Sequence, residues 1–445
     1  MIFRNFRVLL SYLWLFSCHG ELAKGSAPSP EEIGRIGGGL LSLTQGNAAT
    51  KIVHPDGTTS IAHKIFAPGV DFSRLEAILA ANFVLLFGSK TRTELANNFK
   101  PVLEQFKVSH LELTVDLEVQ IHSPDLGVSL WSAIYNGEKC FVVRNILNDS
   151  LAETKGLKEG DVILKPKQSE TPAGRQDRKF ILDFRSLTDD GDIKRGQIVL
   201  SQQEAEATAS ARKAPPVSLQ IFDSGKNKAA VLRIEHFESE EIFKAVQESV
   251  ITLNSLEKSH LLVIDLRANN GGREAVMEKV GQLFYPNQIP DVSISKEEWE
   301  KLGTSKKALS GIEIFDSYKE ARKSWFSKLM NEVDIVPFEG QNIAVLVDSQ
   351  TASSAELLAA ALRNLKEAKI YGQKTARMVL GSHCIRFVPW ATLSYPYLGY
   401  FTCKGENLEG VGVNPDVSFT DEEMLDMPFS TVHPAIARVV EFEAQ

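Results

Sequence analysis

The stretch 345-VLVDSQTASSAELLAAAL-362 joins an apolar run to an apolar helix through a short polar segment. The run from Gln341 to Val347 is apolar without alternation, which is typical of a strand buried on both faces. Ser353 is therefore expected just after a strand and at the start of a helix, where main-chain N–H groups of the first turn can stabilise an oxyanion. Two interpretations are open at this point: Ser353 is a nucleophile, or it only caps the helix.

Elements of the same kind flank this stretch and predict an α/β core. Strands are expected over 229–237, 260–266 and from 369, with helices over 240–256 and 355–365. Strand, helix and strand at this spacing form a βαβ unit. Ligands of open α/β sheets collect beyond the carboxyl ends of the strands, and both Gly271–Gly272 and Ser353 fall at such ends.

The rest of the chain predicts a helical N-terminal region and a β-rich middle. Apolar residues recur at helical spacing between about Pro28 and Leu111, and we interpret them as core packing. Short β-rich runs begin near Glu112, and the polar stretch 201–218 indicates a linker. The expected parts are a signal peptide at 1–25, a helical region at 28–112, a β-rich domain at 113–228, an α/β core at 229–425 and a helical tail at 426–445.

The N-terminus has the pattern of a secretory signal peptide. Two arginines precede a short apolar run, Val8–Phe16, which is too short to span a bilayer, and small residues follow it. Cleavage after Gly20 fits this pattern. The residues before Cys18 resemble a bacterial lipobox, but Phe16 fits its position poorly, so we favour a chain without a lipid anchor. The pattern predicts export to the periplasm or the extracellular space.

Charge and cysteine content narrow the function classes. The 445 residues carry a formal net charge of −8, which gives no basic surface for nucleic acid. If Cys18 leaves with the signal peptide, Cys140, Cys384 and Cys403 remain. Export permits a Cys384–Cys403 disulfide across a hairpin, and three free thiols are the alternative. The sequence has no C-x-x-C or His/Cys cluster typical of zinc, and we expect neither a metal nor an organic cofactor.

One phrase of the β-rich middle, 145-NILNDSLAETKGLKEGDVILK-165, resembles a PDZ domain of the kind found in secreted proteases. In such domains a loop and edge strand bind peptide C-termini, because an edge strand's unpaired N–H and C=O groups can pair with an extended peptide. The corresponding residues here are Leu126, Gly127, Val128, Ser129 and Leu130. The alternative is a PDZ fold that packs or gates without a ligand.

Four phrases, in matching order and spacing, make the chain resemble the C-terminal processing (tail-specific) serine peptidase family. They are the PDZ phrase, 263-VIDLRANNGG-272, 345-VLVDSQTASSAELLAAAL-362 and 408-LEGVGVNPD-416. The resemblance implies a ClpP/crotonase-like α/β core, protein or peptide substrates that include C-terminal tails, and a nucleophile at Ser353. The family's common branch pairs that serine with a lysine. Met378 holds the lysine's place here and cannot accept a proton.

A second branch of the family, which includes the tricorn protease core and the chlamydial protease-like activity factor, uses a Ser–His–Glu arrangement. Resemblance to this branch implies His110, in 103-LEQFKVSHLELT-114, as the general base. It implies Glu409 as the residue that orients the imidazole, directly or through a second polar group. His383 lies near the position of the missing lysine and is the rival base.

The resemblance also assigns the groups around the serine. The main-chain N–H of Ser354, with that of Gly271 or Gly272, would form the oxyanion hole. Asp265 and Arg267 are interpreted as a structural ion pair.

The leading hypothesis is a secreted serine endopeptidase that acts through an acyl-enzyme on Ser353. The alternative, motivated by Met378, is a catalytically inactive pseudoprotease that binds peptides through its PDZ-like domain. A carrier of small apolar ligands is a third hypothesis, which no residue favours. The segment 273–329 is expected to be a solvated helical excursion, with a lid or an oligomer contact as alternatives.

Overall fold

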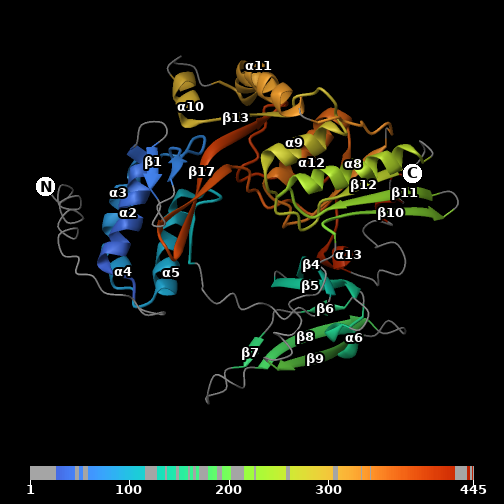
Figure 1. Ribbon diagram of the computed structural model, residues 1–445, viewed down its shortest axis with the longest axis horizontal. Helices are drawn as coiled ribbons and strands as arrows, with labels where there is room; N and C mark the ends of the chain where they lie inside the picture. The colour runs from blue at the N-terminus through green and yellow to red at the C-terminus, as the bar shows by residue number, and fades with distance from the viewer. Residues whose placement is uncertain are drawn as a thin grey trace. The chain divides into compact units, whose positions relative to one another are not determined.

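The chain divides into two compact units in the computed structural model, which describes residues 27–443 with gaps (Figure 1). Unit 1 comprises Met1–Glu118, Asp291–Arg322 and Met378–Val411, and unit 2 comprises Val119–Pro290, Lys323–Arg377 and Gly412–Gln445. The gaps are 46–49, 54–58, 116–127, 136–137, 147–149, 159–160, 164–166, 170–178, 188–192, 202–214, 225–226, 257–260, 304–308, 332, 341, 426–437 and 441–442.

Unit 1 contains the helical N-terminal region. Its elements here are α2 (Pro30–Gln45), the hairpin of β1 (Thr50–Val53) and β2 (Thr59–Ala62), η1 (Phe72–Arg74), α3 (Leu75–Ala81), α4 (Phe83–Phe87), α5 (Arg92–Leu103) and η2 (Glu104–Phe106). Local sequence explains where α2 begins. The Ser29 N–H donates to Glu32 Oε2 (2.7 Å), and the Glu32 N–H donates to Ser29 Oγ (3.1 Å), which together form a capping box. Pro30 takes the first helical position, where an N–H has no partner in the helix.

An antiparallel sheet completes unit 1. It consists of β3 (Glu112–Val115), β13 (Asp291–Ile294), β16 (Gly381–Val388) and β17 (Ala391–Thr402). The long strand β17 pairs with each of the other three. α10 (Lys296–Gly303) follows β13, and α11 (Gly311–Met330) comes next in the chain. This sheet therefore joins three segments that lie far apart in the sequence.

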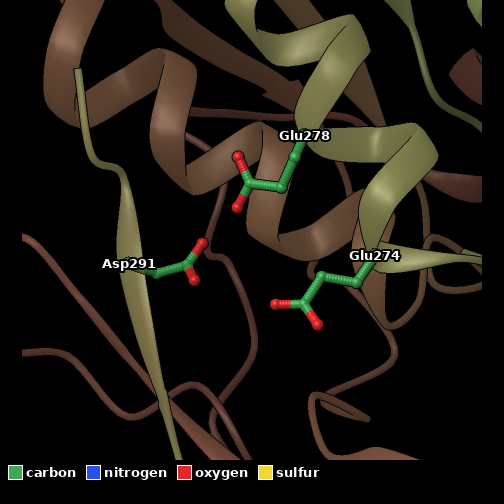
Figure 2. A group of neighbouring side chains, drawn as sticks. All are labelled: Glu274, Glu278 and Asp291. Carbon is green, nitrogen blue, oxygen red and sulfur yellow. The ribbon is translucent and has the colours of Figure 1, made fainter. Parts of the chain in front are cut away.

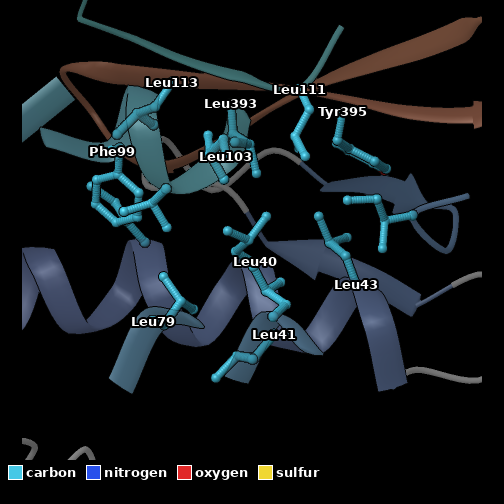
Figure 3. Packing of buried hydrophobic residues seen from close by; sticks show 14 of the residues in the cluster. Leu40, Leu41, Leu43, Leu79, Phe99, Leu103, Leu111, Leu113, Leu393 and Tyr395 are labelled. Atoms are coloured by element: carbon cyan, nitrogen blue, oxygen red, sulfur yellow. The ribbon is translucent and has the colours of Figure 1, made fainter. Parts of the chain in front are cut away.

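The core of unit 1 lies between the helices and this sheet. Leu40, Leu79 and Phe99 of the helices pack in one buried cluster with Leu393 and Tyr395 of β17 (Figure 3). Burial of each such side chain contributes about 1.5–3 kcal/mol to folding. Leu111 and Leu113 belong to the same cluster. The core thus anchors the chain directly after His110.

Unit 2 contains the α/β core around a mainly parallel sheet of order β10-β11-β12-β14-β15-β18. The strands are β10 (Val217–Ser224), β11 (Asn227–Ile234), β12 (Leu261–Asp265), β14 (Ile343–Val347), β15 (Lys369–Gly372) and β18 (Val417–Ser418). β10 is antiparallel to β11, and the other neighbours are parallel. The helices are α8 (Glu240–Asn254), α9 (Glu274–Gln282), α12 (Ser354–Lys366) and α13 (Asp421–Leu425), with α8, α9 and α12 drawn beside this sheet in Figure 1.

The β-rich middle of the chain forms a second, antiparallel sheet in unit 2. Its elements are β4 (Val128–Tyr135), β5 (Glu138–Ile146), α6 (Leu151–Thr154), β6 (Val162–Ile163), β7 (Lys167–Ser169), β8 (Lys179–Leu187) and β9 (Ile193–Ser201). Among the described strands, β4 pairs with β5 alone and so ends the sheet. Val128, Ser129 and Leu130 begin β4, whereas Leu126 and Gly127 lie outside the described residues. Peptide binding by these residues stays a prediction.

The expected α/β fold class is confirmed. The boundaries between the parts of the chain differ from those expected from the sequence. β10 pairs with β11 along its whole length, so the core sheet begins before residue 229. Residues 378–411 belong with the N-terminal helices, because β16 and β17 pack on them. The segment 273–329 is not simply a solvated excursion, since Val276, Val280 and Phe284 are buried. The signal peptide and most of the tail lie outside the described residues.

The three cysteines among the described residues are free thiols. Cys140 is buried, Cys384 is exposed and Cys403 is intermediate. Register explains why the hairpin does not join the last two, since Cys384 lies opposite Ser394 in the β16–β17 pair. No helix among the described residues has the length and apolar character needed to cross a membrane.

Candidate active site

A buried aspartate shapes the turn that follows β14. Asp348 Oδ1 accepts hydrogen bonds from the N–H groups of Ala268 (3.0 Å), Gln350 (3.0 Å) and Thr351 (2.9 Å). Burial raises the pKa of Asp348, although these N–H groups act in the opposite direction. The Thr351 hydroxyl donates to the carbonyl of Leu266 (2.9 Å), just after β12. The turn is thereby fixed to the neighbouring strand at the carboxyl edge of the sheet.

Ser353 ends this turn in a backbone conformation that side chains rarely adopt. Its φ is 56° and its ψ is −124°, and it is the N-cap residue of α12. Such a conformation costs of order 1–3 kcal/mol and persists only where the surroundings enforce it. Ser353 is half-buried. This is the geometry of a sharp strand-to-helix turn that presents a nucleophile.

The neighbouring serine, Ser354, has different surroundings. Ser354 is only 4% exposed, and its hydroxyl donates to the carbonyl of Gly272 (2.8 Å). Its main-chain N–H lies at the first position of α12, where a helix has no acceptor for it. The hydroxyl of Ser354 is thus structural, while its N–H has the position expected of an oxyanion-hole donor.

The glycine segment after β12 packs against Ser353. A Cβ on Gly271 would lie 2.7 Å from the Ser353 Cβ, and a Cβ on Gly272 would lie 2.6 Å from the main chain of Phe237. Both glycines have positive φ (93° and 136°). The Gly271 N–H donates to Asn269 Oδ1 (2.8 Å), which leaves Gly272 as the better candidate for the second oxyanion donor. The segment is also tied to the turn that ends at Ser353, because the Ala352 N–H donates to the Asn269 carbonyl (2.9 Å).

A buried glutamate joins the turn that ends at Ser353 to the loop after β15. Glu356 is fully buried, and its Oε2 accepts the Ser353 N–H (3.1 Å). Its Oε1 accepts the Arg377 N–H (2.9 Å) and the hydroxyl of Thr375. Thr375 Oγ1 in turn accepts the N–H of Val413 (2.7 Å). Glu356 therefore holds the strained residue from the helix side.

The candidate base, His110, lies in unit 1 on the short loop between η2 and β3. Its φ is 58°, another rarely adopted value. The imidazole hydrogen-bonds to the main chain of Met378, and its Nε2 is buried with no partner among the described residues. The bonded nitrogen is therefore Nδ1, which leaves the Nε2 lone pair to accept a proton. Burial lowers the pKa of His110 below 6.5, although Glu409 and the Met378 bond act to raise it.

The Glu409 carboxylate is bound next to the histidine, in the same unit. Oε1 accepts the N–H of Ser109 (2.7 Å), and Oε2 accepts the Ser109 hydroxyl (2.9 Å) and the Val379 N–H (2.8 Å). Ser109 precedes His110, and Val379 follows Met378, whose main chain binds the imidazole. One carboxylate thus fixes both chain segments that determine the orientation of the ring. Ser109 thus links the Glu409 carboxylate to the loop that carries His110.

The rival base, His383, is part of an aromatic stack on β16. Its ring centroid lies 4.1 Å from that of Tyr397 and 4.9 Å from that of His63. Burial, and then His63, lower the pKa of His383. Nothing in the described residues gives this ring an orienting carboxylate of the kind found near His110. Lys374 is exposed. Neither residue has the surroundings of a catalytic base.

Asp265 and Arg267 form a buried ion pair behind the turn. Arg267 Nε and Nη2 donate to the two Asp265 oxygens (2.9 and 2.8 Å), and Arg233 Nη1 donates to Oδ2 (3.1 Å). Burial would raise the pKa of Asp265, but the two guanidinium groups outweigh it and hold that pKa below its usual range. The arrangement matches the expected structural role. Removing one member leaves an uncompensated buried charge, which costs about 3–5 kcal/mol.

Two acids on α9, the buried Glu278 and the partly buried Glu274, lie outside the groups described so far. Figure 2 shows Glu274 and Glu278 projecting from successive turns of that helix. Asp291 belongs to β13 in unit 1, where Arg322 Nη2 lies 3.4 Å from its Oδ1. The expectation of no metal stays a prediction.

Sequence reasoning missed three residues that support the predicted site. Ser109 stood inside the quoted histidine phrase, and Asn269 stood inside the glycine phrase, but neither spacing reveals a hydrogen-bond partner. Glu356, three residues after the serine, had a clearer signal because Ser-x-x-Glu is a capping-box pattern. The structure brings Ser353, Ser354 and both glycines together in unit 2. It brings His110 and Glu409 together in unit 1.

Gly271→Ala is expected to lower kcat/KM for any peptide substrate by about a hundredfold, because displacement of a reacting group by about 1 Å has that effect. The new Cβ must displace Ser353. Gly156→Ala is the matched control, since Gly156 also has positive φ (77°) but its Cβ would meet nothing within 4 Å. Both variants carry backbone strain, so the comparison of their steady-state rates isolates the contact with Ser353. Equal losses in the two variants would contradict the assignment.

Comparison with known proteins shows which family the central part of the chain resembles. Residues 228–419 match the model of peptidase family S41. A probable CtpA-like serine protease of Staphylococcus haemolyticus (strain JCSC1435) is 23% identical over 328 residues, which is 72% of this chain and 59% of that protein. A probable CtpA-like serine protease of Staphylococcus aureus (strain N315) is 24% identical over 283 residues, 62% of this chain and 49% of that protein. The chain thus spans between about half and three-fifths of these relatives.

Two solved structures also align with most of the chain. A putative S41 protease from Bacteroides fragilis NCTC 9343 aligns with a TM-score of 0.49 and 14% identity, covering 75% of this chain and 86% of that chain. Mature CPAF complexed with lactacystin aligns with a TM-score of 0.48 and 13% identity, covering 84% of this chain and 92% of that chain. The family-model match and the CtpA-like relatives confirm the resemblance that the motifs predicted. Over residues 228–419 this chain is therefore similar to peptidase family S41.

Proposed function

We propose that the chain is an exported serine endopeptidase of the C-terminal processing type, which cleaves unfolded or tail-exposed proteins. The observation that carries this proposal is the strained Ser353 at the start of α12, with the glycine segment against it. An N-cap needs no such conformation, since N-cap residues usually have extended backbone angles. Strain of this kind clusters at reactive sites, where it fixes a side chain in position.

The proposed chemistry uses Ser353, His110 and Glu409. The Ser353 hydroxyl attacks the substrate carbonyl while His110 Nε2 takes its proton. The Ser354 and Gly272 N–H groups stabilise the oxyanion. The imidazolium then gives the proton to the leaving amine, so an acyl-enzyme and a free amine are formed. Water hydrolyses the ester by the same steps and regenerates the serine.

Glu409 acts in this scheme through Ser109. Its carboxylate holds the loop that carries the imidazole, and its charge favours the imidazolium that forms during the reaction. Met378 takes part through its main chain, which binds the other ring nitrogen. The missing lysine therefore does not leave the serine without a base. The imidazole of His110 favours the peptidase over the pseudoprotease hypothesis.

Export and substrate recruitment complete the proposal. The signal-peptide pattern supports export, and protein substrates follow from the peptidase family. β4, at the end of its sheet, offers an edge for an extended peptide, which fits recruitment of C-terminal tails.

The activity is tested by incubating the purified mature protein with a reduced, unfolded polypeptide and following fragments by mass spectrometry. Cleavage that a fluorophosphonate blocks and a metal chelator does not block supports a metal-independent serine peptidase. Cleavage abolished by the chelator, or absence of cleavage with intact binding of the polypeptide, would contradict it. The second result would favour the pseudoprotease hypothesis.

The pKa of His110 sets the acidic limb of the pH profile of kcat/KM, and mutation of a neighbouring carboxylate should move that limb. Burial lowers the pKa of His110, so the neutral base persists below pH 6.5 and activity is lost only as pH falls through that lowered pKa. Glu409→Gln removes a charge that raises this pKa, so the acidic limb moves further down while the plateau falls. Glu112→Gln is the control, because Glu112 also raises the pKa of His110 but contributes less than Glu409 or the Met378 bond. An upward shift in Glu409→Gln would contradict the assignment.

A further inference from the structure

Unit 1 contains a pocket that the proposed peptidase mechanism does not use. Its volume is about 580 Å³, within the range of about 300–1,000 Å³ that ligand sites occupy. The wall is formed by the end of α2, the chain from Ile65 to Glu76, and α10. All of these segments belong to unit 1, and His110 and Glu409 are not among the lining residues.

Aromatic side chains form one part of the wall. Phe66, Phe72 and Trp299 line the pocket, and the rings of Phe66 and Trp299 are tilted by 50° with centroids 6.1 Å apart. The two phenylalanines are buried, whereas Trp299 is half-buried. An aromatic face at a partly open pocket attracts a cation placed over it.

Acidic side chains form another part of the wall. Asp71, Glu76 and Glu300 line the pocket, against the single ammonium group of Lys296. Hydrogen bonds from Ser73, and then Arg74 and Lys296, outweigh burial and lower the pKa of Asp71, so this carboxylate is charged at neutral pH. Lys296 in the lining and Arg74 beside Asp71 offset two of the three carboxylates. The lining therefore carries an excess of negative charge beside aromatic rings.

We propose that this pocket binds an arginine side chain flanked by apolar residues, within a peptide or an unfolded protein segment. A guanidinium group can pair with carboxylates through several N–H donors and can stack on an aromatic face at the same time. The apolar neighbours of the arginine would contact the phenylalanines. The site is separate from the proposed chemistry, and its occupancy does not require that Ser353 be a nucleophile.

The binding is tested by titration calorimetry with the mature chain carrying Ser353→Ala, so that no ligand is consumed. The probes are acetyl-leucyl-arginyl-leucine amide and its citrulline counterpart, which has nearly the same shape and no charge. Both lack a free carboxylate and therefore do not offer the group that C-terminal peptide sites capture. We expect the arginine peptide to bind about tenfold more tightly than the citrulline peptide, given typical cation–π and exposed ion-pair contributions.

Two double variants separate the pocket from general charge effects. Glu76→Gln with Glu300→Gln is expected to reduce the affinity for the arginine peptide to that of the citrulline peptide. Glu104→Gln with Asp316→Asn removes the same charge from acids of unit 1 that do not line the pocket, and it is expected to change nothing. A circular dichroism melt of each variant verifies folding.

The position of the peptide is verified independently with Trp299→Ala, which is expected to weaken binding of both peptides. The proposal is overturned if neither peptide binds, if arginine and citrulline peptides bind equally, or if the two double variants behave alike. Equal loss in both double variants would mean that the peptide senses only the net charge of the protein.

Discussion

Ser353→Ala is expected to abolish peptide hydrolysis, with a loss in kcat of about a million-fold where background permits its measurement. The reason is chemical, because alanine has no oxygen with which to form the acyl-enzyme. Binding of substrate should survive, since the substitution leaves the main-chain N–H groups of α12 in place. The loss is measured with a purified variant and an internally quenched peptide.

Two other serines in the same turn provide the controls. Ser349 is exposed and makes no contact that shapes the turn, so Ser349→Ala is expected to retain full activity. Ser354→Ala retains its N–H and loses only the hydroxyl bond to Gly272, so a reduction of no more than about tenfold is expected. Loss of all hydrolysis in Ser354→Ala, with activity retained in Ser353→Ala, would move the nucleophile by one residue.

His110→Ala is expected to cost nearly as much as Ser353→Ala, because catalytic residues that act as a unit give non-additive losses. The double variant with Ser353→Ala should therefore be no worse than either single variant. Leu111, next in the chain, is anchored in the core of unit 1, so the substitution should not unfold the loop. Equality of the melting temperatures of variant and parent verifies this.

His383→Ala is the matched control for the base. It removes an imidazole of similar burial from the same unit, but one that stacks on His63 and Tyr397. We expect a lower melting temperature, from the lost stacking, and a kcat/KM within about threefold of the parent. A loss of activity in His383→Ala that equals the loss in His110→Ala would contradict the assignment of the base.

The sequence contained enough information for the local elements of the core. Val345–Val347 and the apolar helix after Ser353 follow directly from periodicity, and the strand at Leu261–Asp265 does so too. The position of Ser353 at a strand end follows from the same pattern. The roles of His110 and Glu409 came from family resemblance, since single histidines and glutamates carry no local signal.

Long-range pairing was beyond sequence reasoning. Pairing of β3 with β17 joins Glu112 to Ser394, and no periodicity in either segment encodes that partnership. The same holds for Ser109, whose hydroxyl becomes meaningful only beside Glu409. The expectation for 273–329 was wrong because its charged residues suggested exposure to solvent, whereas Glu278 and Lys279 are buried. Charge predicts exposure only when no buried partner is available.

The positive φ of Ser353 also had no sequence signal, because such strain arises from the surrounding hydrogen bonds. Whether this conformation marks a nucleophile can nevertheless be tested through the reactivity of the Ser353 hydroxyl. A capping serine is an ordinary alcohol, whereas a serine beside a neutral imidazole reacts with phosphonylating reagents.

The most direct measurement is therefore fluorophosphonate labelling of the purified mature protein, with the modified residue located by mass spectrometry. The account predicts a single phosphonylated serine, Ser353, and loss of that label in His110→Ala but not in His383→Ala. Labelling of a different serine, or labelling of Ser353 that persists in His110→Ala, would contradict it.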